Sequence, residues 1–301
     1  MSRLNECINR YGNNQYVQFE ETQNGIVLLK IDHPLASATI SIDGGQVLSW
    51  HPKSQQVPVL WGTQTQHWLK GRAIRAGVPV CWPWFGAHPT DNTLPSHGYA
   101  RLCPWELTDI STNSSDTLEI YLSMLPVHEF ALSLPFAASL TAQITVGESL
   151  SISLMTENTG EQSIKLTEAL HAYFFVSDIA SIQIEGLEGC EYIDLIDHNR
   201  SKTQQGLVSF SGETGRVYQN TTNDCLIRDM ALNRSIRIQK NGSLSTVVWN
   251  PWLETAKKMD DLGPSAWREM VCLESANALD CAMTLEAGAQ HTLAVRYSVE
   301  A

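Results

Sequence analysis

The sequence has 301 residues, and 43% of them are hydrophobic, which is enough to bury a large core. Its formal net charge is −12 at pH 7, so the surface repels nucleic acid and anionic lipid, and neither is expected as a partner. A phosphate-bearing ligand would therefore need a local cluster of Arg or Lys.

Helical signals are few, and strand-like runs dominate. Ser2 can cap a short helix over Arg3–Arg10, and one or two helical turns can form over Leu253–Met259. Runs rich in Ile, Leu, Val and Thr predict strands, and several alternate apolar with polar residues, which places one face on a core. The runs are Ile26–Ile31, Leu35–Ile42, Leu118–Leu125, Leu150–Met155, Ser235–Lys240, Gly242–Trp249 and Met270–Ser275.

Turn signals recur between these runs, at Asp43–Gly45, Asn158–Gly160, Glu188–Gly189 and Asn241–Gly242. No strand–helix unit repeats, and no Pro/Ser-rich linker marks a domain boundary. We therefore expect an all-β fold: one antiparallel β-sandwich domain spanning residues 1–301, with few short helices. Loops at one end of such a sandwich are the natural place for a binding site.

Cysteine usage indicates a reducing compartment. The seven cysteines are scattered and form no C-x-x-C pair, which disfavours a disulfide framework or a thiolate metal site. The N-terminus shows no apolar signal-peptide region, and no apolar run approaches the ~20 residues that span a bilayer. We expect a cytoplasmic, monomeric protein that contacts no membrane.

Two neighbouring segments carry arginines suited to an anion. The Pro- and Trp-rich stretch Gly71–Gly86 suits a shaped edge segment and holds Arg72 and Arg75. Arg binds phosphate through two parallel charge-assisted hydrogen bonds, although a surface role for these two residues stays open. In Ser96-His97-Gly98-Tyr99-Ala100-Arg101, an extended backbone would put His97, Tyr99 and Arg101 on one face. The alternative is a structural His beside an exposed Arg.

Two later segments carry possible acid–base groups. His171 lies in an apolar strand-like run, as a core histidine or a proton donor. Strand alternation sends Glu168, three residues earlier, to the opposite face. Glu274 interrupts the apolar run Met270–Ala276; burial would raise its pKa toward the range of a base, while an edge position would leave it in water.

Aromatic residues and missing motifs limit the classes of reaction that the protein is expected to catalyse. Trp249 and Trp252 could form a stacking wall for a sugar ring, or pack in the core. The sequence has no P-loop, no G-x-G-x-x-G after a strand, no G-x-S-x-G and no H-E-x-x-H. Nucleotide-dependent, hydride-transfer and zinc chemistries lose support, so we expect no cofactor and no metal.

Five segments resemble the D-hexose-6-phosphate mutarotases, or glucose-6-phosphate 1-epimerases, of the galactose mutarotase-like (aldose 1-epimerase) superfamily. They are GRAIRAGVPVCWPWFG, SHGYAR, EALHAYF, VVWNPW and MVCLESA, which occur in the family's order between about Gly44 and Ala276. The resemblance implies a single-domain β-supersandwich, a sugar-phosphate substrate, and interconversion of the α and β anomers without metal or cofactor.

The resemblance also implies roles for individual residues. By position, His171 is similar to the family's general acid and Glu274 to its general base. Arg75 and Arg101 are similar to the pair that binds the 6-phosphate, with Ser96 beside them, and His97 to a histidine that contacts the sugar.

Two positions depart from the family pattern. Ala76 stands where a Gly is usual, and Gly215 stands where an Asp commonly contacts the sugar; Glu213 could replace that contact. Three other functions remain as alternatives: a non-catalytic carbohydrate-binding protein, a mutarotase of free aldoses, and a glycoside hydrolase or lyase. The last usually needs two facing carboxylates, and the two arginines argue against a free sugar.

Overall fold

The computed structural model describes residues 2–63, 68–113, 117–125, 136–263 and 265–300. Within these ranges the chain forms two α-helices, α1 (Arg3–Tyr11) and α3 (Trp252–Ala256), and otherwise mostly β-strands. The Ser2 side chain accepts a hydrogen bond from the Asn5 N–H at the start of α1, as the sequence predicts. No helix in these ranges has the length and apolar character needed to cross a membrane.

Strands near the N-terminus form a four-stranded antiparallel sheet. In spatial order they are β1 (Val17–Glu21), β2 (Val27–Asp32), β3 (Ala36–Ser41) and β4 (Gln46–Pro52). The β3–β4 turn contains Gly44 and Gly45, both at positive φ, where the sequence predicts a turn. The indole of Trp50 donates a hydrogen bond to the Gly147 carbonyl, 3.2 Å away, in the turn between β8 (Ala138–Val146) and β9 (Leu150–Asn158), which ties this sheet to its neighbour.

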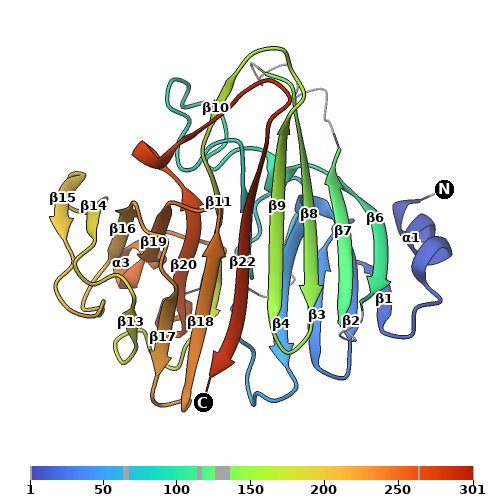
Figure 1. Ribbon diagram of the computed structural model, residues 1–301. Coiled ribbons are helices and arrows are strands. Elements are labelled where there is room, and N and C mark those ends of the chain that lie inside the picture. The colour runs from blue at the N-terminus through green and yellow to red at the C-terminus, as the bar shows by residue number, and fades with distance from the viewer. Residues whose placement is uncertain (1, 64–67, 114–116, 126–135, 264, 301) are drawn as a thin grey trace.

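An eight-stranded antiparallel sheet, here the β22 sheet, crosses the whole molecule (Figure 1). Its strand β9 alternates buried and partly buried residues along its length, as the period-2 pattern of the sequence predicts. In spatial order its strands are β13 (Gln183–Glu185), β17 (Cys225–Asp229), β18 (Arg234–Asn241), β22 (Gln290–Glu300), β9 (Leu150–Asn158), β8 (Ala138–Val146), β7 (Leu118–Met124) and β6 (Trp105–Thr112).

A second eight-stranded antiparallel sheet, here the β20 sheet, carries the candidate site. Its spatial order is β15 (Arg200–Thr203), β14 (Glu191–Asp194), β16 (Thr214–Gln219), β19 (Ser245–Asn250), β20 (Met270–Asn277), β11 (Glu168–Leu170) and β5 (Val80–Cys81), with β12 (Tyr173–Phe175) also paired to β20. The short strands β10 (Ile164–Leu166) and β21 (Met283–Leu285) pair separately. Every residue of β20 is buried, so neither face of this strand meets water.

One hydrophobic cluster joins the three large sheets. It includes Trp50 of the four-stranded sheet, Tyr297 of the β22 sheet and Leu273 of the β20 sheet. Tyr297 meets Phe174 of β12 edge-on, with ring centroids 5.1 Å apart. In Figure 1 the four-stranded sheet lies behind strands β6–β9 of the β22 sheet. The β20 sheet lies toward the opposite end of the β22 sheet, near β17 and β18. The predicted antiparallel β-sandwich with few helices is confirmed.

Candidate active site

The pairing of β11 and β12 with the central strand β20 places His171 against Glu274. Leu170 pairs with Ser275 and Tyr173 pairs with Cys272, so His171, between the two short strands, falls opposite Glu274. Nε2 of His171 lies 3.3 Å from Oε1 of Glu274, and the two side chains are only 10% and 1% exposed. Glu274 is therefore buried, and the edge position that the sequence left open is wrong.

Burial pushes both groups toward their uncharged forms. It raises the pKa of Glu274 well above the ordinary carboxylic acid value, and the positive charge of Arg101 opposes this only in part. Burial also lowers the pKa of His171 well below the ordinary imidazole value, with His97 and Arg101 acting in the same direction. In this uncharged form the pair holds one proton, on Glu274, and the imidazole nitrogen that could accept it lies 3.3 Å away.

His97 reaches the His171 imidazole from a tight turn. The sequence expectation of an extended segment is wrong, because His97 has a φ of 64° and Gly98 a φ of 74°. A Cβ on Gly98 would lie 2.0 Å from the Trp82 carbonyl oxygen, so only Gly fits this turn. The imidazole of His97 nevertheless meets that of His171 edge-on at 5.4 Å, while Tyr99 is buried beside Trp84.

The hydrogen bonds of His97 fix its protonation. Burial, together with the charges of Arg101 and Arg75, lowers the pKa of His97 to about 3, so the ring is neutral near pH 7. Its Nδ1 accepts a hydrogen bond from the Gly86 N–H at 3.3 Å and lies 3.4 Å from the Cys81 sulfur. The ring proton therefore sits on Nε2, which makes His97 a neutral hydrogen-bond donor.

The two arginines act on the same pair of imidazoles. Arg75 and Arg101 each lower the pKa of both His97 and His171, which places both guanidinium groups near these rings. Arg75 donates Nε–H to Asp261 at 2.9 Å and lies beside the Tyr173 hydroxyl.

Among the residues that the structure describes, Arg101 has no negatively charged partner. One of its terminal nitrogens donates to the Ser96 carbonyl at 2.7 Å, and within the described ranges it forms no ion pair. Its buried Nε–H has no hydrogen-bond partner there either. Ser96 thus contributes its backbone carbonyl to Arg101, and the guanidinium keeps a donor free for an anion.

Aromatic rings pack around the His171 imidazole. The Tyr173 ring stacks on His171 with centroids 5.0 Å apart, and Trp249 meets His171 edge-on at 6.3 Å. Of the two tryptophans that the sequence offers as an aromatic wall, Trp249 lies beside His171, whereas Trp252 packs against Trp267 at 4.7 Å. Gly77, beside Ala76 in the arginine segment, has a φ of 55°.

Gly215 lies beside Trp249. It pairs with Trp249 across β16 and β19. A Cβ added to Gly215 would lie 3.4 Å from Leu195 and from Ile196, so apolar side chains border the position. The exposed Glu213, the possible replacement for an Asp at this position, accepts a hydrogen bond from the Thr255 hydroxyl at 2.7 Å.

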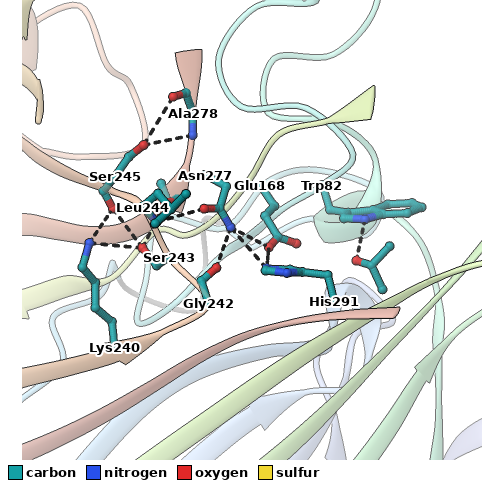
Figure 2. A network of polar contacts seen from close by, with 12 residues as sticks. Trp82, Glu168, Lys240, Gly242, Ser243, Leu244, Ser245, Asn277, Ala278 and His291 are labelled. Atoms are coloured by element: carbon teal, nitrogen blue, oxygen red, sulfur yellow. Dashed lines mark hydrogen bonds and ion pairs between the residues drawn. The ribbon is translucent and has the colours of Figure 1, made fainter. Parts of the chain in front are cut away.

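Glu168 takes part in a separate network, as strand alternation predicts. Its carboxylate lies 3.2 Å from Nε2 of His291 and accepts a hydrogen bond from the Asn277 side chain at 3.2 Å. Figure 2 shows Glu168, Asn277 and His291 converging, with Asn277 also reaching the Gly242 carbonyl at 2.7 Å. The region around β11 and β20 therefore contains two His–Glu pairs: His171–Glu274 at the candidate site and His291–Glu168 outside it.

This second pair should make folding stability depend on pH. The hydrogen bond to Glu168 raises the pKa of His291 above the value of an unfolded histidine, about 6.5. The stabilisation is fully present below about pH 6.5 and is lost as pH rises through the raised pKa of folded His291. Urea unfolding of the wild type and of His291→Gln across pH 5–9 measures this difference; parallel curves for the two proteins would contradict it.

Sequence reasoning missed three residues at the site. Tyr173 lies two positions after His171, and Cys272 lies two positions before Glu274, so strand alternation could have indicated both. Asp261 reaches Arg75 across a separation of 186 residues, which no local pattern reveals. Within the described ranges, His171, Cys272 and Glu274 are the residues grouped closely enough to hold a metal ion.

The antiparallel sheets match the galactose mutarotase-like fold. The chain belongs to the aldose 1-epimerase family, whose profile matches residues 27–298.

This chain is similar to known proteins in both sequence and structure. A protein of Escherichia coli K12 named "Putative glucose-6-phosphate 1-epimerase" is 36% identical over 252 residues, which is 83% of each chain. A protein of the same name from Cenchrus ciliaris is 32% identical over 83% of this chain and 78% of its own. A crystal structure of a Salmonella typhimurium protein described as a "putative mutarotase" has a TM-score of 0.87 and 29% identity, covering 95% of this chain and 94% of the other.

Proposed function

We propose that this protein interconverts the α and β anomers of a hexose 6-phosphate, with glucose 6-phosphate as the first substrate to test. The observation that carries the proposal is the buried Glu274–His171 pair, 3.3 Å apart, on which the charges of Arg75 and Arg101 act. Family membership supports the anomer exchange, and the names of the relatives support the sugar phosphate.

The exchange needs one base and one acid. Glu274 removes the proton from the C1 hydroxyl as a C1=O double bond forms and the bond from C1 to the ring oxygen breaks. His171 donates its proton to that ring oxygen. Rotation about C1–C2 and the reverse transfers then close the ring as the other anomer. The proton count is conserved: the charged pair becomes the neutral pair that burial favours, and closure restores it.

The remaining groups hold the substrate. Arg75 and Arg101 bind the 6-phosphate, which supplies binding energy far from the reacting atoms and positions the ring. A dianionic phosphate also offsets the positive charges that hold down the pKa of His171, so substrate binding favours the protonated acid. His97 donates its Nε2–H to the sugar, and the Trp249 ring lies along its apolar face.

Anomer exchange can be measured directly by NMR exchange spectroscopy or polarimetry with glucose 6-phosphate. We expect catalysis of the phosphorylated sugar to exceed that of glucose. A protein that binds the sugar phosphate without accelerating exchange would be a carbohydrate-binding protein instead.

The pH dependence of kcat/KM should be a broad bell. The active form holds one proton on the pair, so activity falls at low pH when a second proton adds and at high pH when the shared proton leaves. Because the pKa of His171 is lowered and that of Glu274 is raised, the acid limb lies below the ordinary imidazole value and the alkaline limb above the ordinary carboxylic acid value. A single limb with midpoint near pH 6.5, the ordinary histidine value, would contradict this assignment.

A further inference from the structure

The proposed chemistry leaves one reactive group at the site unused. Cys272 lies two residues before Glu274 on β20, so both side chains project from the same face of the strand. The Cys272 sulfur, an imidazole nitrogen of His171 and a carboxylate oxygen of Glu274 all lie within 4.8 Å of one another, and all three residues are buried.

We propose that Cys272, His171 and Glu274 form a binding site for a thiophilic divalent cation of the Zn²⁺ type. A thiolate, an imidazole and a carboxylate are ligands that Zn²⁺ accepts together, whereas Mg²⁺ and Ca²⁺ prefer oxygen atoms alone. Three protein ligands leave a fourth tetrahedral position for water, as in zinc sites that stay open to small molecules.

The geometry of two of the ligands already fits. Zinc bonds of about 2.0–2.2 Å at tetrahedral angles put nitrogen and oxygen ligands about 3.3–3.5 Å apart. Nε2 of His171 and Oε1 of Glu274 are separated by 3.3 Å. The second carboxylate oxygen of Glu274 and Nδ1 of His171 have no hydrogen-bond partner, so few existing contacts hold these groups away from an ion.

The charges of the site also balance. On binding, the Cys272 thiol and the Glu274 carboxylic acid release their protons to solvent, and the two negative charges equal the charge of the ion. Burial raises the pKa of the Cys272 thiol, and the Tyr173 hydroxyl beside the sulfur opposes this in part, because it can donate a hydrogen bond to the thiolate. Arg75 and Arg101 repel a cation, so we expect reversible binding.

Metal binding and anomer exchange would exclude each other. The ion would bond to Nε2 of His171 and to the carboxylate of Glu274. These are the groups that would otherwise transfer protons to and from the sugar. Zn²⁺ should therefore inhibit the enzyme in competition with glucose 6-phosphate. This inhibition rests on the proposed function, whereas the binding itself rests only on the ligand geometry.

Cobalt(II) tests the binding without any activity measurement. Titration of the full chain with Co²⁺ should produce a thiolate-to-cobalt charge-transfer band at one ion per chain, and Zn²⁺ should abolish it. Cys272→Ala should lose this band, and Cys272→Ser provides a second variant should the alanine variant misfold by circular dichroism. Cys225→Ala removes a buried thiol on another sheet and should keep the band. A wild type without the band, or an unchanged band in folded Cys272 variants, would overturn the site.

Inhibition tests the consequence separately. Removing a ligand should raise the Zn²⁺ concentration needed for half-inhibition by about tenfold or more in Cys272→Ala, with Cys225→Ala like the wild type. A cobalt band that depends on Cys272 but no Zn²⁺ inhibition would overturn the claim that the ion blocks the sugar. A metal-free wild type that fails to exchange anomers would instead refute the proposed function and leave the cobalt result standing.

Discussion

Replacing Glu274 with Gln should slow anomer exchange by about 10²–10⁴-fold, the usual contribution of a general base, and leave glucose 6-phosphate binding measurable. The amide keeps the shape of the side chain but cannot take the proton from the C1 hydroxyl. Exchange rates from NMR and affinity from calorimetry separate the two effects. Near-normal turnover in this variant would remove Glu274 from the mechanism.

Glu168→Gln is the matched control for this variant. Glu168 is another fully buried carboxylate, paired with its own histidine, and it lies three residues before His171. The change should lower stability through the loss of the charged contact with His291, yet anomer exchange should stay close to the wild type. A loss of exchange equal to that of Glu274→Gln would mean that removing any buried charge here disrupts the site.

Arg75→Ala should lower kcat/KM for glucose 6-phosphate by about 10–100-fold and have little effect on glucose. Hydrogen bonds between charged partners contribute about 1.5–3 kcal/mol, and only the phosphorylated substrate makes them with this residue. Most of the change should appear as a higher KM. Steady-state kinetics with both sugars measures the ratio, and equal effects on both would exclude a phosphate role.

Arg72→Ala supplies the control for charge. Arg72 lies three residues before Arg75 and is exposed, and within the described ranges it forms no ion pair. Its removal changes the net charge by the same amount and should not alter the preference for the phosphorylated sugar. If both variants lost the same activity toward glucose 6-phosphate, general attraction of the anion would explain the result better than a local contact.

Much of the fold follows from local patterns. Alternation of apolar and polar residues predicts β9 and β18, and the Gly- and Asn-rich turns fall where strands end. The Pro-rich segment is at an edge as predicted, because β5 spans only Val80–Cys81 and ends the β20 sheet. Alternation fails around His97, since it applies only to an extended backbone and His97 adopts a positive φ.

The site was predictable only in part. Residue types alone leave His171 and Glu274 open to structural roles, and the resemblance to a known family singled them out. Their contact depends on the pairing of β11 with β20, in which Leu170 meets Ser275 across more than a hundred residues. The ion pair between Arg75 and Asp261 likewise arises from long-range packing, so no sequence motif predicts it.

The two His–Glu contacts around β11 also bear on how its register is specified. A shift of one residue along β20 would turn every side chain of this three-residue strand to the other face. Glu168 would then lose Asn277, and His171 would lose Glu274, so misalignment would leave two buried carboxylates without their partners. Only the correctly aligned chain satisfies both buried carboxylates, so these contacts, one at the candidate site and one outside it, favour a single register of β11 on β20.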